Sequence, residues 1–290
     1  MSQSTTLDPS WAECLDVDFM FSNHKQIYKR RIEKRQRKLL SKIPDLSQFL
    51  RTDERVLLVA TCCSPTSLLE QLTGGWIVFY INRALLVITD QRILHLPATP
   101  NFGYRDSIAQ VEYADCEDIR VGSRHLKIRY RNGSKETFLF LRNERAKLKA
   151  HFKDFKSGSR RGPSSTLGGR VHLCPRCTAP LQPDHYQCDK CRLTFKDMGT
   201  ATRLSLLLPG GGYFYTGHWF LGIGDLMVEA GLLLLVADAM SGGLAGQEGS
   251  WEAATFFGGL LAIEKLITVY HARRYIREYL PNDRPVTPRG

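Results

Sequence analysis

The sequence predicts a multidomain α+β membrane protein. Three observations support this fold class: short apolar runs with turn signals over residues 51–155, two Cys-x-x-Cys pairs between residues 174 and 191, and two long apolar segments after residue 218. Charge is distributed unevenly, since residues 204–271 contain seven charged side chains and only one, Lys265, of the 40 Lys and Arg residues. This pattern excludes a disordered chain and indicates a polar, basic body joined to an apolar module.

Residues 1–50 are predicted to contain a basic amphipathic N-terminal helix. Between residues 24 and 42, nine basic residues against one acid, Glu33, contribute +8 to the net charge of +11. Apolar residues at 28, 32, 39 and 43 predict one apolar stripe on a helix that ends near Pro44. Three uses fit such a helix: packing on the next domain, lying on anionic lipid, or binding nucleic acid. The residues predicted to face lipid are Lys25, Lys29, Arg30, Arg31, Lys34, Arg35, Arg37 and Lys38.

Residues 51–155 have the pattern of a β domain, which indicates a barrel or a sandwich. Asn132-Gly133 predicts a hairpin with a type I′ turn, because that turn needs positive φ at both central residues. Residues 143–155 predict a closing helix with Leu148 and Phe152 on its apolar side. The apolar runs, separated by Gly, Asn and Asp, predict strands over 56–61, 76–81, 84–89, 92–96, 108–113, 119–121, 126–130 and 136–141.

The run Leu85-Leu86-Val87-Ile88-Thr89-Asp90-Gln91-Arg92-Ile93-Leu94 combines an apolar strand, Thr, a polar turn, Arg and a second apolar strand. Together with the strand at 108–111 and the Gly-turn hairpin before the closing helix, it resembles the pleckstrin-homology-like superfamily, in particular bacterial and GRAM-like members. The resemblance implies a seven-stranded barrel capped by one helix, with an interaction or positioning role. A phosphoinositide site would need basic residues in the first strand loop, and residues 64–75 contain Glu70 and no Lys or Arg.

Residues 156–170 are rich in Gly, Ser and Arg and are predicted to be a flexible linker. In residues 171–198, the pairs Cys174-Pro-Arg-Cys177 and Cys188-Asp-Lys-Cys191 are separated by ten residues. Their thiolates can supply the four soft ligands of one tetrahedral Zn²⁺ site. Because four thiolates leave no open position, a single structural Zn²⁺ is expected, and its binding should stabilise the segment.

The cysteine pattern resembles the short zinc-ribbon family, in which two such knuckles flank a β-hairpin. Arg192 stands where that family often has Gly after the last cysteine. A redox role for the pairs is not expected, because no βαβ pattern surrounds either of them.

Residues 203–271 are predicted to form a transmembrane helical hairpin. Residues 219–239 and 251–270 provide apolar stretches of 21 and 20 residues, close to the ~20 that cross a bilayer, with aromatic residues at their ends. Arginines flank the hairpin, whereas the Gly-rich link has no Lys or Arg. The positive-inside rule therefore places both termini in the cytoplasm, the protein in the inner (cytoplasmic) membrane, and residues 272–290 in a basic cytoplasmic tail.

The leucine-rich residues 204–208 are too short to span a bilayer and predict an interfacial or re-entrant start, with a third span as the alternative. They are followed by Pro209-Gly-Gly-Gly, Tyr213-Phe-Tyr-Thr-Gly and then Leu221-Gly-Ile-Gly. This order resembles small two-helix membrane domains of bacteria. The resemblance implies membrane insertion and no particular activity.

Asp238 and Glu252 lie at the ends of the apolar stretches, and four charged residues lie further inside them, namely Asp225, Glu229, Glu264 and Lys265. A charge at the bilayer centre costs about 2.5–3.5 kcal/mol, so we expect these residues to be paired or functional. In the first case Lys265 pairs with Asp225 or Glu229 across the hairpin, or with an oligomer partner. In the second case the four residues form a proton or cation path in an oligomer. The remaining alternative is a shallow hairpin that does not span the membrane. Close contact between the two helices of the hairpin would be permitted by four glycines, Gly222, Gly224, Gly258 and Gly259.

The function expected from these segments is that of a non-enzymatic, membrane-anchored adaptor or scaffold. Its partners would be membrane lipids and either a protein partner or further copies of the chain. Two alternatives stay open: an oligomeric membrane transport component that uses the acids of the hairpin, and a membrane-linked protein that binds nucleic acid through the basic helix and the ribbon. Catalysis is not expected, because the sequence has no P-loop, Rossmann fingerprint or nucleophile–base constellation.

Overall fold

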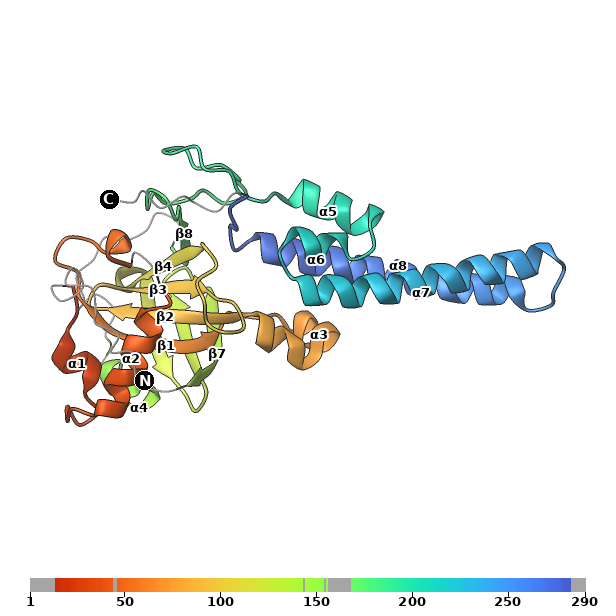
Figure 1. The fold of residues 1–290 in the computed structure, drawn as a ribbon. Coiled ribbons are helices and arrows are strands. Elements are labelled where there is room, and N and C mark those ends of the chain that lie inside the picture. Colours follow the sequence, from red (N-terminus) through yellow and green to blue (C-terminus); the bar gives the residue numbers. More distant parts are fainter. Residues whose placement is uncertain (1–13, 44–45, 143, 154, 156–167, 283–290) are drawn as a thin grey trace, which may run out of the picture. The chain divides into compact units, whose positions relative to one another are not determined.

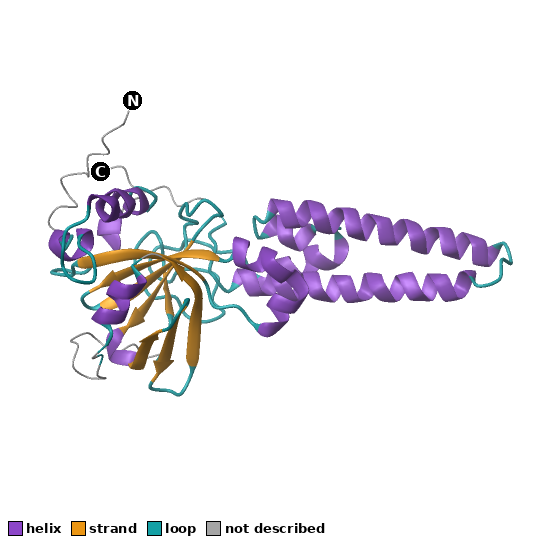
Figure 2. Ribbon diagram, turned by 90° about the horizontal axis from the view of Figure 1, so that it is seen from below, coloured by secondary structure: helices purple, strands orange, loops and turns teal. Residues whose placement is uncertain are grey.

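The computed structural model describes residues 14–43, 46–142, 144–153, 155 and 168–282. The chain divides into two compact units, the first extending to Leu193 and the second beginning at Thr194. Figures 1 and 2 show a β-sheet with short helices in the first unit and helices in the second. The predicted mixed α+β class is confirmed.

An eight-stranded antiparallel sheet forms the centre of the first unit. Two meanders, β1 to β4 and β5 to β7, are joined where β7 pairs with β1, and β8 is added beside β4. The sheet is open, with β5 and β8 at its edges, so strand pairing does not close the predicted seven-stranded barrel. The strands are β1 (Val56–Cys63), β2 (Arg83–Thr89), β3 (Arg92–Pro97), β4 (Ile108–Glu112), β5 (Cys116–Val121), β6 (His125–Tyr130), β7 (Lys135–Arg142) and β8 (Val171–Leu173).

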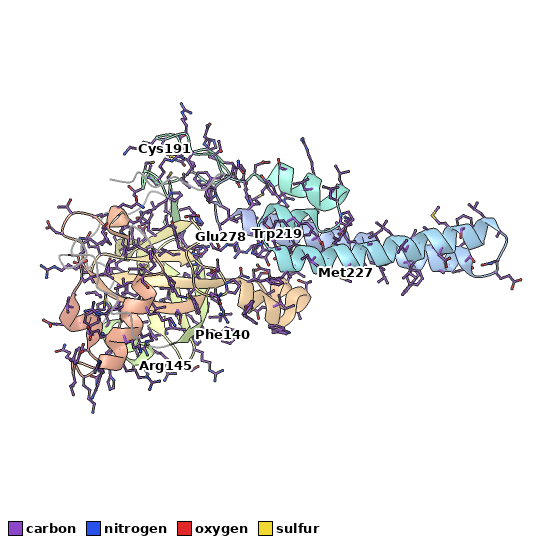
Figure 3. All side chains as sticks on the ribbon, viewed as in Figure 1. Phe140, Arg145, Cys191, Trp219, Met227 and Glu278 are labelled. Atoms are coloured by element: carbon purple, nitrogen blue, oxygen red, sulfur yellow. The ribbon has the colours of Figure 1, made fainter. Side chains whose placement is uncertain are left out.

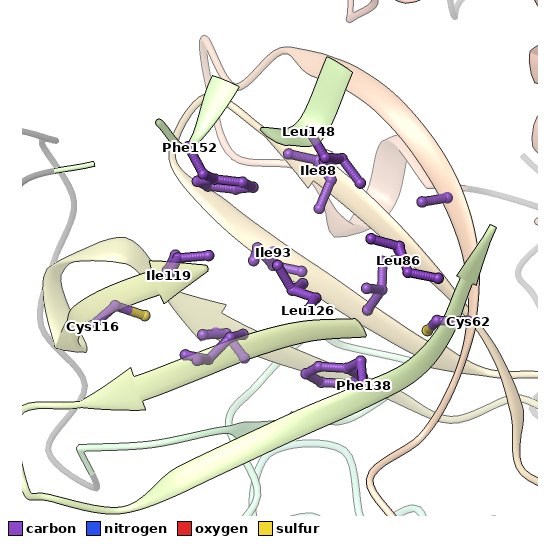
Figure 4. Close-up of a cluster of buried hydrophobic side chains, with 14 of the residues drawn as sticks. Cys62, Leu86, Ile88, Ile93, Cys116, Ile119, Leu126, Phe138, Leu148 and Phe152 are labelled. Carbon is purple, nitrogen blue, oxygen red and sulfur yellow. The ribbon is translucent and has the colours of Figure 1, made fainter. Parts of the chain in front are cut away.

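One hydrophobic core lies between the strands and the helix α4 (Arg145–His151), as Figure 4 shows. Leu86 and Ile88 of β2 point into it, and Leu148 and Phe152 cover it from the helical side. The closing helix is therefore confirmed, although α4 is shorter than the predicted 143–155. Its place after the last strand of the second meander allows its apolar side to cover the end of this core.

A second core uses the opposite face of β2, because successive side chains of a strand point to opposite sides of the sheet. Leu85 and Val87 lie in this core, which is covered by N-terminal elements that include α1 (Val17–Phe21) and the 3₁₀ helix η2 (Leu46–Phe49). Burial of both faces explains the uninterrupted apolar run in β2, since no position of that run meets solvent.

The basic helix α2 (Arg30–Leu40) packs on the sheet through one face. Gln36 is fully buried, and its side-chain amide donates to the Val59 carbonyl oxygen at 2.9 Å and accepts from the Val59 N–H at 2.8 Å. Leu39 and Leu40 are buried in the second core. Of the three uses that the sequence allowed for this helix, packing on the next domain is observed.

The strand predicted over residues 76–81 is wrong, because these residues belong to the helix α3 (Leu68–Ile81). A capping box starts this helix: the Ser67 hydroxyl accepts from the Glu70 N–H, and the Glu70 carboxylate accepts from the Ser67 N–H. Gly75, with φ of 52°, breaks the helix into two parts. The Ser-Leu-Leu-Glu signature in the sequence is typical of a helix start, whereas the strand over 76–81 was predicted from its apolar run alone.

The hairpin predicted around Asn132-Gly133 is confirmed as β6 and β7, but its turn is not type I′. Gly133 has φ of 84°, whereas Asn132 is absent from the described residues with positive φ. The Asn132 side chain accepts from the N–H of Ser134 at 2.9 Å and from its hydroxyl at 2.6 Å. These local hydrogen bonds favour an Asx turn with one left-handed residue over a two-residue primed turn.

The motif Thr89-Asp90-Gln91-Arg92 forms the turn between β2 and β3 and holds a buried ion pair. Arg92 binds Glu54 in a bidentate manner, with Nε 2.9 Å from Oε1 and Nη2 2.8 Å from Oε2. The Thr89 hydroxyl and the Arg51 N–H also donate to the Glu54 carboxylate, each at 2.8 Å. The polar residues of this motif are therefore explained by structure, with Glu54 as a partner that the sequence did not indicate.

The pH dependence of stability tests this ion pair. Burial by itself would raise the pKa of Glu54, but hydrogen bonds and the charge of Arg92 outweigh it, so that the pKa lies below its ordinary value. A depressed carboxyl pKa adds stability above the unfolded pKa of about 4.3, and this stability is lost as pH falls through the lower folded value. We expect Glu54→Gln to lower the free energy of unfolding by about 2 kcal/mol at pH 7 and to flatten its acid dependence.

Thermal unfolding of both proteins in detergent, followed by circular dichroism between neutral and acidic pH, measures this difference. The control is Glu117→Gln, which removes a half-exposed carboxylate on β5. Equal acid slopes for the wild type and the Glu54 variant would contradict the assignment.

The second unit contains four helices, α5 (Met198–Leu207), α6 (Gly211–Tyr215), α7 (Trp219–Leu244) and α8 (Ser250–Ile276). Two of them, α7 and α8, are long and apolar enough to cross a membrane by length and composition, and they include both predicted spans. The leucine-rich start forms α5, which has ten residues and is too short for a third span. The helices α5 and α6 both pack on α8.

Close contact in this unit is made by glycines other than those predicted, apart from Gly222. A Cβ added to Gly210, which has φ of 68°, would lie 2.3 Å from the Gly222 carbonyl oxygen, so this turn requires glycine. A Cβ added to Gly222 would meet the Phe214 ring of α6 at 2.6 Å. A Cβ added at any of the other predicted contact glycines would meet no described atom within 4 Å, and these are Gly224, Gly258 and Gly259.

Candidate metal centre and polar cluster of the hairpin

The four cysteines of the two Cys-x-x-Cys pairs converge at one point of the first unit. The Sγ atoms of Cys174 and Cys191 are 3.4 Å apart, those of Cys177 and Cys188 are 3.5 Å apart, and all four lie within 4.8 Å of one another. Each close distance joins one knuckle to the other. Four sulfurs about 2.3 Å from a central Zn²⁺ form a tetrahedron with edges of about 3.8 Å, so the cluster has the dimensions of such a site.

The backbone builds both knuckles in the same way. The carbonyl oxygen of Cys174 accepts from the Thr178 N–H, and that of Cys188 accepts from the Arg192 N–H, each at 2.9 Å. Both Thr178 and Arg192 have φ of 58°. The residue after each knuckle is therefore left-handed, which explains the glycine often found there in zinc ribbons and places Arg192 in a conformation that disfavours a side chain.

Zinc would be held by the four cysteines alone. Neither His172, which lies in β8, nor the exposed His185 belongs to the cluster within the described part of the chain. Closed four-sulfur coordination would supply folding free energy and would offer no position for a substrate.

The metal centre is joined to the sheet through β8. Ile108 of β4 pairs with Leu173, and Gln110 pairs with Val171, immediately before the first cysteine. Leu173 also lies in the second core. The sequence predicted a linker up to residue 170 and a separate ribbon, but it contained no signal for this pairing, because a three-residue strand has no detectable periodicity.

Replacing Arg192 by Gly is expected to strengthen zinc binding. The left-handed conformation costs about 1–2 kcal/mol for a residue with a Cβ, and the greater freedom of unfolded Gly offsets about half of this. Because Arg192 is exposed, the net gain should be about 0.5–1 kcal/mol, measured by chelator competition for zinc. Arg176→Gly is the matched control, since Arg176 is exposed in the first knuckle without positive φ. Equal effects of the two substitutions would contradict the prediction.

The remaining cysteines are structural thiols. Cys62 lies in the first core, while the Cys63 thiol donates to the Phe79 carbonyl oxygen, so the vicinal pair is split between the two faces of β1. Burial, with a smaller effect of Cys63, raises the pKa of the Cys62 thiol, and burial raises the pKa of the Cys116 thiol to about 12. Thiols with raised pKa are poor nucleophiles at neutral pH.

The cations predicted to face lipid do not form one uniform surface. Arg35 pairs with Glu144, and Arg37 pairs with Glu33 at 2.8 Å, so both have protein partners. The Glu144 carboxylate is buried, which fixes the Arg35 side chain against the sheet domain. The remaining six cations are exposed: Lys25, Lys29, Arg30, Arg31, Lys34 and Lys38.

In the second unit, the sequence-predicted charges meet between the helices. Lys265 of α8 lies with its Nζ 2.6 Å from Glu229 Oε2 of α7, one of the two pairings that the sequence allowed. The Nζ also donates to the Ser205 carbonyl oxygen of α5 at 3.0 Å. Glu229 is fully buried, and its second oxygen has no hydrogen-bond partner among the described residues. The pair therefore connects three helices of the unit.

Thr268 connects the other two acids. Its hydroxyl lies 2.8 Å from Glu264 Oε1 and 3.1 Å from Asp225 Oδ1. The carboxylate oxygens of Asp225, Glu229 and Glu264 come within 4.8 Å of one another, so these three acids of α7 and α8 gather in one internal cluster. Thr268 is fully buried, and the sequence did not single it out because a threonine in an apolar helix carries no charge signal.

Comparison with known proteins adds no relative: no family model, curated protein or solved structure matches this chain. The identity of each part therefore depends on the residues and contacts described above.

Proposed function

We propose that the protein is a membrane-anchored, non-enzymatic adaptor of the inner (cytoplasmic) membrane, with the sheet domain and a zinc-stabilised ribbon in the cytoplasm. The observation that carries the proposal is the distribution of side chains on α7 and α8, in which apolar residues face outward and charged residues away from the helix ends face the partner helix. Large apolar side chains are exposed along both helices, among them Trp219 and Met227 of α7 (Figure 3). In the apolar 18-residue stretch of each helix, only 11% of the residues of α7 and 6% of those of α8 are buried. The charged residues away from the helix ends lie between the helices instead, as is typical of segments that face lipid, and these are Asp225, Glu229, Glu264 and Lys265.

The order of elements supports a pleckstrin-homology-like domain as the cytoplasmic part. Four strands of one meander are followed by three strands of another and then by α4, whose residues cover the first core. This is the order that the resemblance implies, with β8 as an addition and α3 inserted between the first two strands. Domains of this kind serve as interaction modules, so binding of a protein or of anionic lipid is the activity proposed.

The membrane arrangement is tested by labelling single added cysteines in intact cells with a membrane-impermeant maleimide. Glu248→Cys lies in the exposed link between α7 and α8, and Arg31→Cys lies on the exposed face of α2. We expect labelling of the first variant in intact cells and of the second only after permeabilisation. Labelling of Arg31→Cys in intact cells, or of neither variant in any condition, would contradict the proposal.

The acidic cluster supports a second candidate, an oligomeric transport component. This candidate is supported by three carboxylates between two apolar helices, whose oxygens lie within 4.8 Å of one another. Asp225→Asn combined with Glu229→Gln separates the candidates: ion flux in proteoliposomes that disappears while thermal stability is kept favours transport. Loss of stability without any measurable flux in the wild type favours the anchor.

A further inference from the structure

The first unit contains an open pocket of about 580 Å³ whose charged lining is entirely cationic. Arg35, Lys38 and Lys42 reach it from α2 and the following turn, and Arg83 reaches it from the start of β2. None of the described lining residues is acidic. A concave site lined by four cations selects an anion that presents several oxygen atoms, such as a phosphate group.

Three of the four cations of the pocket are held in place by contacts within the protein. Arg83 stacks between the rings of Tyr80 and Phe102, with its guanidinium carbon 4.6 and 5.1 Å from their centres. Arg35 is fixed by Glu144, and its Nε is buried without a hydrogen-bond partner among the described residues. Lys42 donates to the Asn101 carbonyl oxygen, and Lys38 is exposed.

The helix α3 borders the same pocket and has a large apolar face that no described residue covers. Leu68, Leu72 and Trp76 have exposed fractions of 71%, 74% and 75%. They are spaced four residues apart along α3, although its axis is broken at Gly75.

The inner side of α3 is anchored to the sheet, so its outer face is held in position. Val78 is buried, and the Phe79 ring packs edge-on against the Phe140 ring of β7 at 4.8 Å, where Figure 3 labels Phe140. The Phe79 carbonyl oxygen accepts from the Cys63 thiol of β1.

We infer that α3 and the adjoining pocket bind the surface of an anionic phospholipid membrane, with a headgroup phosphate in the pocket and the apolar face of α3 in the interfacial layer. A cationic pocket beside an exposed apolar helix matches the order of layers in a bilayer, in which the charged headgroups lie next to the acyl chains. The inference deepens the proposed function and rests on it, because the hairpin that follows Thr194 would keep the sheet domain close to the membrane.

This assignment differs from the sequence-based expectation in the origin of the cations. The loop after β1 contains no Lys or Arg from residue 64 to 75, and it supplies the apolar helix instead. Three of the four cations come from α2 and the turn that follows it, and the fourth, Arg83, comes from the start of β2. Only the tertiary structure brings these two segments, more than twenty residues apart, to one pocket.

Hydrogen exchange of the full chain in lipid nanodiscs tests the inference. One set of nanodiscs contains phosphatidylcholine alone, and the other contains equal amounts of phosphatidylcholine and phosphatidylglycerol. We expect amides of residues 68–81 to exchange about tenfold more slowly in the anionic nanodiscs, because bound α3 opens less often. Lys38→Gln combined with Lys42→Gln should remove this protection.

The matched control is Lys25→Gln combined with Lys34→Gln, which removes the same charge from exposed positions outside the pocket lining. It should keep the protection of α3. Leu68→Ser combined with Leu72→Ser should remove the protection while β1 to β3 stay protected, because these leucines are exposed and contribute little to the folded core.

Equal protection of the α3 amides in both lipid compositions would show that the pocket does not bind an anionic headgroup. Equal loss of this protection in the two double lysine variants would show that the headgroup is not bound in this pocket. Exposure of α3 in every nanodisc, with residues 219–276 protected, would overturn the inference, leave the anchor intact and assign the apolar face to a protein. Exchange throughout residues 219–276 would instead contradict the proposed function itself.

Discussion

Replacement of Cys174 by Ser is expected to release zinc and to unfold residues 174–193, because a structural Zn²⁺ contributes about 10–16 kcal/mol to the folding of such a segment. The four-cysteine segment has few buried apolar residues of its own, with Leu181 and Leu193 among them. The remaining sheet should stay folded, since β8 is an edge strand of three residues. Elemental analysis measures the zinc content, and hydrogen exchange measures the local unfolding.

Cys14→Ser is the control for this experiment, because Cys14 lies outside the four-cysteine cluster and is half-buried. We expect it to retain one zinc ion per chain and the exchange pattern of the wild type. Wild-type protein purified without zinc, or Cys174→Ser with a full complement of zinc, would contradict the metal assignment.

Replacement of Lys265 by Met is expected to destabilise the second unit by about 3–5 kcal/mol, because it leaves the buried Glu229 carboxylate without its counter-charge. The variant also removes the donor to the Ser205 carbonyl oxygen, so the contact of α5 with α8 should loosen. The midpoint of thermal unfolding in detergent, followed by helical circular dichroism, measures the loss. The double variant Lys265→Met with Glu229→Gln should recover most of the stability.

Glu252→Gln provides the control, since Glu252 is an exposed acid near the start of α8. Its unfolding midpoint should equal that of the wild type. Additive effects in the double variant, with no recovery, would show that Lys265 and Glu229 do not interact energetically and would remove the pair as the organising contact of the hairpin.

Local sequence signals predicted the elements that depend on local physics. Seven of the eight expected strands are present within one or two residues at most ends, because apolar side chains on a sheet must recur along each strand. The exception, 76–81, is apolar but mostly not buried, with Val78 as its buried residue, so its composition resembled that of a strand although the capping box at Ser67 starts a helix. Whether an apolar run is buried depends on which other segments pack against it, and the run itself does not contain that information.

The two candidate sites were predictable to different degrees. The cysteine spacing predicted which four sulfurs meet, because ligand positions in a knuckle are fixed by a few residues of backbone. The cationic pocket was not predictable, since Arg83 and the cations of α2 are brought together by the fold. The eight cations predicted for lipid contact divide accordingly: Arg35 and Lys38 line the pocket, and Arg37 pairs within its own helix.

Residues within a few positions of one another were enough to predict the four cysteines that meet, the two apolar helices and most of the strands. The tertiary structure decided which charges pair, where β8 docks and which apolar face remains uncovered. These properties depend on segments that are far apart in the chain, as in the pairing of Glu229 with Lys265 and of Glu54 with Arg92. Such contacts form where packing excludes water around both partners, and the sequence around either partner does not indicate this packing.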